Sequence, residues 1–265
     1  MNTKSLLEYY QQRLINLKFS KQTVKSYYTT VNSFLNHFED RANPNEITTK
    51  EIEDYILSFP NRNTQISYYS PIKKFYIEVM ENETIFDGLE RPKRVHTDKK
   101  SLDKKEMLKR ISQVPNLKHE TILTITFSTG MKLSEVLNIR LIDINREEMV
   151  LSIRNTKEEI VRFCPLSIKV ITLIDNYINR YKPTMYLFNG QNAPKYNKKS
   201  VECMVTKWLG ADMSMTAIRN STARALFQSG TDITLIQRQL GLKSIKLTKK
   251  YLTSFIKNKK IVLPI

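Results

Sequence analysis

The chain has 265 residues, of which 40% are hydrophobic and 26% are charged. This composition is typical of a globular protein and excludes an intrinsically disordered chain. No stretch approaches the roughly 18 apolar residues of a membrane helix, and the N-terminus lacks the apolar core of a signal peptide, so we expect an intracellular protein without membrane contacts. Two cysteines, Cys164 and Cys203, are too few for a disulfide framework and lack metal-site spacing.

The positive charge is concentrated in the second part of the chain. The formal net charge is +17; residues 1–100 carry 15 Lys+Arg against 13 Asp+Glu, and residues 101–265 carry 28 against 13. A one-sided positive field of this kind favours a polyanionic partner, most simply nucleic acid. The alternative is a basic protein whose charge serves only its solubility.

Residues 1–90 have the apolar periodicity of a domain of four helices. Apolar residues recur at helical spacing over residues 5–18 and, after the capping residue Ser20, over residues 24–38. A third helix opens with a capping box that begins at Thr48 and stops before Pro60. A fourth covers about residues 64–80, where Pro71 should kink or split it.

Residues 91–101 are polar and lack an apolar period, so we interpret them as a basic inter-domain linker. Arg91, Lys93 and Arg94 are expected to contact a polyanion. A linker that is simply solvated remains the alternative.

Residues 102–265 predict a second domain that is also helical, with a small β-hairpin or sheet, so the fold class is mainly α (α+β). Residues 149–166 indicate two strands around a turn near Asn155. Gly130, Gly230 and Gly241 are expected to end helices. One helix is expected to begin at Asp103. Further helices are expected near residues 120–129, 132–139, 167–180, 199–209, 216–228, 233–240 and 244–256.

Four residues of this second domain suggest a chemistry. Lys132 follows a helix cap, Lys157 lies in the hairpin turn, and Arg219 and Tyr251 lie on later helices. A tyrosine can attack a phosphodiester, and cations stabilise the negative charge that spreads over the non-bridging oxygens. Any one of the four alone is more simply a surface residue, so the hypothesis depends on their order within one domain.

Three segments resemble the sequence boxes of the tyrosine recombinases of the phage integrase family. "STGMKLSEVLNIRLIDIN" resembles the first-arginine box, and "RNTKEEIVRFCPL" resembles the hairpin with the catalytic lysine. "MTAIRNSTARALFQSGTDITLIQRQLGLKSIKLTKKYL" resembles the H-x-x-R box and the tyrosine motif in unbroken register. Residues 1–90 resemble the family's SAM-like core-binding domain, which clamps DNA, and "LERPKR" resembles its exit into the linker. The likeness implies a catalytic domain over residues 102–265.

The resemblance implies roles for the four residues. Tyr251 is the nucleophile that forms a 3′-phosphotyrosyl link, Arg219 and Lys132 hold the non-bridging oxygens, and Lys157 protonates the leaving 5′-hydroxyl. Strand rejoining then completes site-specific recombination or integration without a metal, ATP or another cofactor. The implied partners are double-stranded DNA and further copies of the chain, as a tetramer on paired sites. The expected DNA contacts near the nucleophile are Lys243, Lys246, Lys249 and Lys250.

Three positions depart from the family pattern. Lys132 replaces the first arginine, Thr216 replaces the histidine of H-x-x-R, and Leu242 replaces the usual histidine or tryptophan. Lysine lacks the planar two-pronged phosphate contact of arginine, threonine does not transfer protons at neutral pH, and leucine forms no side-chain hydrogen bond. These departures support a second hypothesis, a catalytically impaired recombinase fold that only binds or scaffolds DNA.

Two more alternatives belong to other classes of protein. "ALFQSGTDITLIQRQLGL" also fits a helix–turn–helix, so a non-catalytic DNA-binding protein is one of them. A type IB topoisomerase shares the tyrosine chemistry but relaxes supercoils without partner sites.

Overall fold

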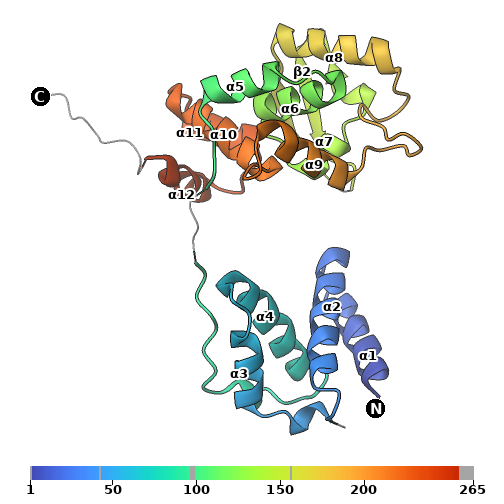
Figure 1. Cartoon of the computed structure of the whole chain (residues 1–265), viewed down its shortest axis with the longest axis vertical. Helices are drawn as coiled ribbons and strands as arrows, with labels where there is room; N and C mark the ends of the chain where they lie inside the picture. The colour runs from blue at the N-terminus through green and yellow to red at the C-terminus, as the bar shows by residue number, and fades with distance from the viewer. Residues whose placement is uncertain (1, 42, 96–98, 156, 257–265) are drawn as a thin grey trace, which may run out of the picture. The chain divides into compact units, whose positions relative to one another are not determined.

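The computed structural model describes residues 2–41, 43–95, 99–155 and 157–256. The chain divides into unit 1, residues 1–97, and unit 2, residues 98–265, each with its own apolar core (Figure 1). Helices dominate both units and a small antiparallel sheet lies in unit 2, so the predicted fold class is confirmed. Within the described ranges, no helix has both the length and the apolar character that crossing a membrane requires.

Unit 1 is built by helices whose ends follow local signals in the sequence. The Ser20 hydroxyl accepts the N–H of Thr23 at 3.2 Å, and Thr48 forms the predicted capping box with Glu51. Its core is rich in buried aromatic side chains, including Phe34. The elements are α1 (Thr3–Asn16), α2 (Lys21–His37), α3 (Thr49–Leu57) and α4 (Arg62–Glu78), with short 3₁₀ turns at Pro44–Glu46 and Thr84–Phe86.

Helix α4 runs through Pro71 without being split, so of the two predicted outcomes, a kink or a split, the split is wrong. The proline side chain is buried, and its carbonyl oxygen accepts a hydrogen bond of 2.8 Å from the hydroxyl of Tyr10 on α1. A proline inside a helix costs about 3 kcal/mol. Packing against α1 and the other helices of unit 1 therefore outweighs this local penalty.

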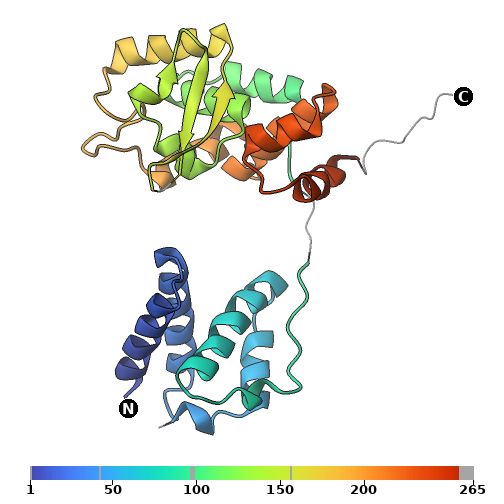
Figure 2. The same cartoon turned by 180° about the vertical axis from the view of Figure 1, so that it is seen from behind.

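Unit 2 surrounds the central helix α6 with further helices and the sheet. Helix α6 contacts both α8 and α10, which explains why most of its residues from Thr121 to Thr129 are buried. The sheet faces the viewer in Figure 2, with helices of the unit behind it. The helices are α5 (Lys104–Ser112), α6 (Leu117–Thr129), α7 (Leu133–Leu137), α8 (Ile168–Tyr181), α9 (Lys198–Leu209), α10 (Met215–Gln228), α11 (Ile233–Leu240) and α12 (Ile245–Ile256), with a 3₁₀ turn at Leu141–Asp143.

The sheet has one strand more than the predicted hairpin. Strands β2 (Val150–Arg154) and β3 (Ile160–Pro165) form that hairpin, and β1 (Ile144–Asn145) pairs with the other edge of β2. Leu151 of β2 is paired with Ile144 on β1 and with Cys164 on β3, and these pairs define the register of the sheet. Two residues are too few for the alternation that identifies a strand in a sequence.

Two helices of unit 2 end at the glycines that the sequence marks as stops. Gly130 closes α6 with φ +66°, and Gly241 closes α11 with φ +59°. This left-handed backbone is favourable for glycine and costs other residues energy. Both helix ends face α10, and they supply the carbonyl groups that hold the candidate active site.

Candidate active site

Arg219 lies on α10 with only 8% of its surface exposed. Its two terminal nitrogens donate hydrogen bonds to the backbone carbonyls of Gly130 and Leu240. These carbonyls belong to the C-terminal ends of α6 and α11, where unpaired carbonyl groups carry partial negative charge. Burial lowers the pKa of Arg219, while nearby Tyr251 and Glu135 act to raise it. The two helix ends therefore stabilise a buried cation and fix its orientation.

Tyr251 lies on α12 next to this guanidinium. Its hydroxyl donates a hydrogen bond to Oδ1 of Asn220, the residue after Arg219 on α10. Burial raises the pKa of the Tyr251 phenol, and the charge and hydrogen bonding of Arg219 oppose that rise. The arrangement thus places a partly buried phenol beside a cation that favours its ionised form.

The nucleophile candidate is also held by residues that the sequence assigned to the linker. The ammonium of Lys99 lies 3.6 Å from the centroid of the Tyr251 ring and donates to the Tyr251 carbonyl at 2.9 Å. The carbonyl of Lys100 accepts from Nδ2 of Asn220 at 3.0 Å. Residues 99 and 100 therefore pack on α10 and α12, whereas residues 96–98 of the expected linker lie outside the described residues.

A cavity of about 260 Å³ opens beside Arg219. Lys132, at the start of α7, and Thr216, in the first turn of α10, line it together with Arg219. Both Lys132 and Thr216 are exposed, so they are accessible to a bound anion. The other lining residues are Leu133, Lys198, Glu202, Ser214 and Met215.

Three predicted site residues, Tyr251, Lys157 and Leu242, are not among the residues that line this cavity. Lys157 is exposed in the turn between β2 and β3, where its N–H donates to Oδ1 of Asn155 at 2.8 Å. Leu242 is half-buried and packs with Leu240 and Leu252 in a small apolar cluster that Tyr251 also contacts. The structure therefore brings Lys132, Thr216 and Arg219 to one cavity, and neither Lys157 nor Leu242 is among its lining residues.

The basic residues expected to contact DNA are exposed. In unit 2 they occupy α12 and the turn before it, and in unit 1 two of them, Arg91 and Arg94, line a cavity of about 420 Å³ beside α4. Arg91 also donates to the hydroxyl of Ser70 at 3.4 Å. The complete set is Lys243, Lys246, Lys249, Lys250, Arg91, Lys93 and Arg94.

The sequence interpretation missed a buried ion pair below the cavity. Glu135 accepts two hydrogen bonds of 2.8 Å from Arg162 on β3, and the two side chains are only 10% and 8% exposed. Burial acts to raise the pKa of Glu135, but the bonds from Arg162 and from the Lys132 N–H outweigh it and lower the pKa. The pair ties the start of α7 to the sheet. Glu135 stands in the "TGMKLSE" box, and Asn220 directly follows Arg219, so proximity to the motifs was the available signal.

Comparisons with known proteins identify the family of both units. The family described as "Phage integrase family" matches residues 100–257, and "Phage integrase, N-terminal SAM-like domain" matches residues 6–85. Tyrosine recombinase XerA of Pyrococcus horikoshii is 26% identical over 264 residues, which cover 92% of this chain and 89% of that protein.

Two solved structures share the fold. XerH site-specific recombinase bound to a palindromic difH substrate, a post-cleavage complex, has a TM-score of 0.72 at 16% identity and covers 87% of this chain and 76% of its own. A lambda integrase dimer bound to a COC′ core site has a TM-score of 0.74 at 14% identity and covers 95% of each chain. The chain belongs to the phage integrase family of site-specific tyrosine recombinases.

Proposed function

We propose that the cavity beside Arg219 binds the scissile phosphate of duplex DNA and that Tyr251 is the nucleophile. Arg219 and Lys132 stabilise the negative charge on the non-bridging oxygens, and Lys157 protonates the leaving oxygen. The observation that carries this assignment is the hydrogen bond from the Tyr251 hydroxyl to Asn220, which places the phenol beside the adjoining buried residue Arg219. A nucleophile beside a fixed cation is the arrangement that a phosphoryl transfer requires.

The reaction proceeds in two transfers. In the first, the phenol oxygen of Tyr251 bonds to phosphorus, the bond from phosphorus to the 5′-oxygen breaks, and Lys157 gives a proton to that oxygen while the phenol proton passes to solvent. In the second, a 5′-hydroxyl of a partner strand attacks the phosphotyrosine and releases Tyr251. The number of phosphoester bonds is unchanged, and covalent catalysis divides one difficult step into two easier ones.

Arg219 keeps donors for this task although both terminal nitrogens already hold backbone carbonyls. A guanidinium has five N–H donors, and Arg219 lines the cavity with the remaining ones available to a ligand. Lys132 adds a second positive charge on the opposite element, α7. Two cations from different helices are suited to the charge of one phosphate group.

The protein would hold duplex DNA mainly through phosphate contacts by the basic residues of both units. Relatives with this fold have been solved on DNA, one as a dimer on a core site, which supports DNA binding and self-association here. We propose that recombination is carried out by a tetramer on two paired sites. Lys243, Lys246, Lys249 and Lys250 near the nucleophile, and Arg91, Lys93 and Arg94 in unit 1, supply the charge.

The assignment is tested with nicked duplex substrates that trap the covalent intermediate. The wild type should give a protein–DNA band on a denaturing gel, and Tyr251→Phe should give none while it still binds the duplex. An identical adduct with Tyr251→Phe would overturn the assignment of the nucleophile. Because the cognate site must be supplied, the substrates are drawn from the DNA that flanks the gene.

One observation favours a second candidate, DNA binding without cleavage. Thr216 lines the cavity at the position where the family pattern has a proton-transferring histidine. If the wild type binds cognate duplexes tightly and gives no adduct on any of them, this candidate replaces the catalytic one. Relaxation of supercoiled plasmid without partner sites would instead support the topoisomerase alternative.

A further inference from the structure

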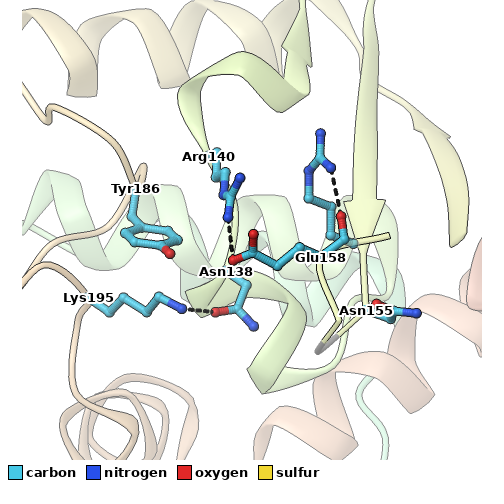
Figure 3. A pocket seen from close by; sticks show the side chains of 7 residues that line it. Asn138, Arg140, Asn155, Glu158, Tyr186 and Lys195 are labelled. Atoms are coloured by element: carbon cyan, nitrogen blue, oxygen red, sulfur yellow. Dashed lines mark hydrogen bonds and ion pairs between the residues drawn. The ribbon is translucent and has the colours of Figure 1, made fainter. Parts of the chain in front are cut away.

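A second charged pocket lies beside the turn that carries Lys157. It encloses about 50 Å³ and is lined by the cations Arg140, Arg154 and Lys195 and by Glu158. Figure 3 shows the ion pair between the Arg140 guanidinium and the Glu158 carboxylate. Asn138, Asn155 and Tyr186 complete its lining. None of these residues has a role in the chemistry proposed above.

The cations of this pocket are held in place by contacts that do not involve Glu158. Nε of Arg154 bonds Oδ1 of Asp143 at 2.6 Å, and this aspartate side chain is only 1% exposed. Nζ of Lys195 bonds Oδ1 of Asn138 at 2.6 Å and lies 4.3 Å from the centroid of the Tyr186 ring. The positive charges of Arg154 and Lys195 therefore stay in position whether or not the Glu158 side chain is present, which is the preorganisation that an anion site needs.

Arg140 is anchored by its backbone and by its neighbours. Its N–H donates to Oδ2 of Asp143 at 3.0 Å, its main chain pairs with Tyr186, and its guanidinium carbon lies 5.9 Å from that ring. The side chain of Arg140 is 17% exposed and lines the pocket. The Nη2 atom of Arg140 forms the ion pair with the Glu158 carboxylate.

Glu158 is the weakly held member of the group. Its side chain is 60% exposed, and its backbone has φ +68°, a conformation that few residues other than glycine adopt readily. Arg140, and more distantly Lys195 and Arg154, hold the pKa of Glu158 below its usual range, so the carboxylate is charged near neutral pH. An exposed ion pair contributes only about 0–1 kcal/mol, so a stronger anion can displace it.

We propose that this pocket is a binding site for a phosphodiester group of the DNA backbone and that the Glu158 carboxylate occupies it until DNA arrives. A phosphodiester matches the fork of the Arg140 guanidinium with two parallel hydrogen bonds and also accepts from Lys195. The inference rests on the proposed DNA binding of unit 2. Asp143 pairs with Arg154 and Glu158 with Arg140, so three cations face two carboxylates and the group keeps an excess of one positive charge.

Replacement of the Glu158 carboxylate by a phosphate would act on the turn that carries Lys157, the proposed general acid. Glu158 directly follows Lys157, and its carbonyl accepts from Arg154 at 2.8 Å. Oδ1 of Asn155 accepts the N–H groups of Lys157 and Glu159, at 2.8 and 3.1 Å, and holds the backbone of the turn. When a phosphate replaces the Glu158 side chain, the hydrogen bonds from the turn backbone to Asn155 remain, and the Glu158 side chain is released from Arg140. Binding at the pocket thus couples DNA contact to the residue beside Lys157.

The test measures the affinity of the full chain for a labelled 30-base-pair duplex by fluorescence anisotropy over a series of KCl concentrations. Glu158→Gln should bind about fivefold to tenfold more tightly than the wild type at low salt, because the competing charge is gone. The matched control is Glu147→Gln, which removes an exposed charge from the β1–β2 turn at the opposite end of β2 and should change affinity less than twofold. Arg140→Gln should weaken binding and reduce the salt slope by about one, the loss of one phosphate contact.

The decisive comparison combines the two substitutions. In an Arg140→Gln background, Glu158→Gln should bring no gain, since the site that it would open has lost its main donor. Equal gains for Glu158→Gln and Glu147→Gln, or a gain that persists without Arg140, would overturn the site. Lys195→Gln serves as the background if Arg140→Gln melts below the assay temperature. If the wild type itself does not bind the duplex, DNA binding fails and the pocket fails with it.

Discussion

The hydroxyl of Tyr251 donates a hydrogen bond to Oδ1 of Asn220, and Asn220 is the neighbour of Arg219 in the chain. The amide nitrogen of Asn220 in turn holds the carbonyl of Lys100 at 3.0 Å. One buried amide, 4% exposed, therefore links the candidate nucleophile to residues at the start of unit 2. The position of the phenol depends on Asn220 as well as on the cation beside it.

Asn220→Asp should slow cleavage by adding a negative charge beside the phenol. The pKa of Tyr251 is already raised by burial, and a neighbouring carboxylate disfavours the phenolate further. Below the phenol pKa, each additional pKa unit reduces the phenolate fraction about tenfold, so the pH–rate profile of adduct formation should move to higher pH. We expect a rate loss of about tenfold at pH 7.5, measured with trapped substrate.

Asn220→Ala is the matched control because it removes the same acceptor without adding charge. The pH–rate profile of Asn220→Ala should have its inflection at a lower pH than that of Asn220→Asp. Melting curves should show that both variants are folded. If the two variants share one profile, the charge at this position does not act on Tyr251.

Gly130→Ala should destabilise unit 2 and weaken cleavage together. An added Cβ would lie 2.4 Å from Cδ2 of Leu240, which is fully buried and has little room to move. The left-handed backbone at φ +66° adds about 1–2 kcal/mol for a residue with a side chain. Because the carbonyls of Gly130 and Leu240 both hold Arg219, displacement of either one should disturb the guanidinium. Urea unfolding and adduct formation measure the two effects.

Gly230→Ala separates backbone strain from the close contact. Gly230 has φ +80° and nothing within 4 Å of an added Cβ, so only the cost of the backbone conformation should remain. We expect normal cleavage and a smaller loss of unfolding free energy than for Gly130→Ala. Equal losses in the two variants would mean that the approach of Leu240 is easily relieved.

Local signals in the sequence were enough to predict many helix ends. Ser20, Thr48 and Asp103 cap helices with their own side chains, and Gly130 and Gly241 end helices in the left-handed conformation. Each of these effects involves residues within four positions of one another. The helical fold class followed from them and from apolar periodicity.

The contacts that shape the candidate site are long-range and were not predicted. Lys99 meets Tyr251 across 152 positions of the chain, and no local pattern distinguishes it from other basic residues of the expected linker. Helix α4 passes Pro71 within the packed core of unit 1, where the Pro71 carbonyl also accepts from Tyr10 of α1. Positions that packing determines therefore lie beyond what periodicity and capping reveal.

Trp208 should report the protonation of His119 through its fluorescence. Nε1 of Trp208 donates to Nδ1 of His119 at 3.1 Å, so this nitrogen is unprotonated in the native state. Burial, with the charges of Lys118 and Lys207, lowers the pKa of His119. Trp208 is the single tryptophan of the chain, so its emission isolates this pair. Acidification should quench the emission with a midpoint below pH 6.5.

The lowered pKa of His119 also predicts how the stability of the protein changes with pH. Between the lowered native pKa of His119 and the ordinary value near 6.5, the unfolded state binds more protons than the native state. Stability from this group is therefore present above about pH 6.5 and is lost as the pH falls through the native pKa. His119→Gln keeps an acceptor for Trp208 but does not titrate, so it should flatten both the fluorescence change and this part of the pH dependence.

Lys132→Arg should raise the rate of cleavage. Lys132 and Arg219 line the same cavity, and an arginine at position 132 could make the planar two-pronged contact to phosphate that a lysine cannot. The gain should be at least about tenfold in adduct formation, because one preorganised donor is worth about 10²–10³ in rate. DNA affinity should change little, since the contact strengthens as charge develops on the phosphate. Leu242→His would restore the other family donor but would also remove a side chain from the apolar cluster around Leu240, so its gain should come with lower stability.

The control for Lys132→Arg is Lys198→Arg, a substitution of the same kind in the same cavity. If only Lys132→Arg speeds cleavage, the gain belongs to a specific contact with the scissile phosphate. A folded Lys132→Arg variant with unchanged or lower cleavage would mean that the cavity is adapted to lysine. Tight duplex binding without any adduct, in the wild type and in this variant alike, would leave Tyr251 as a packing residue on α12 and the protein as one that binds DNA without cutting it.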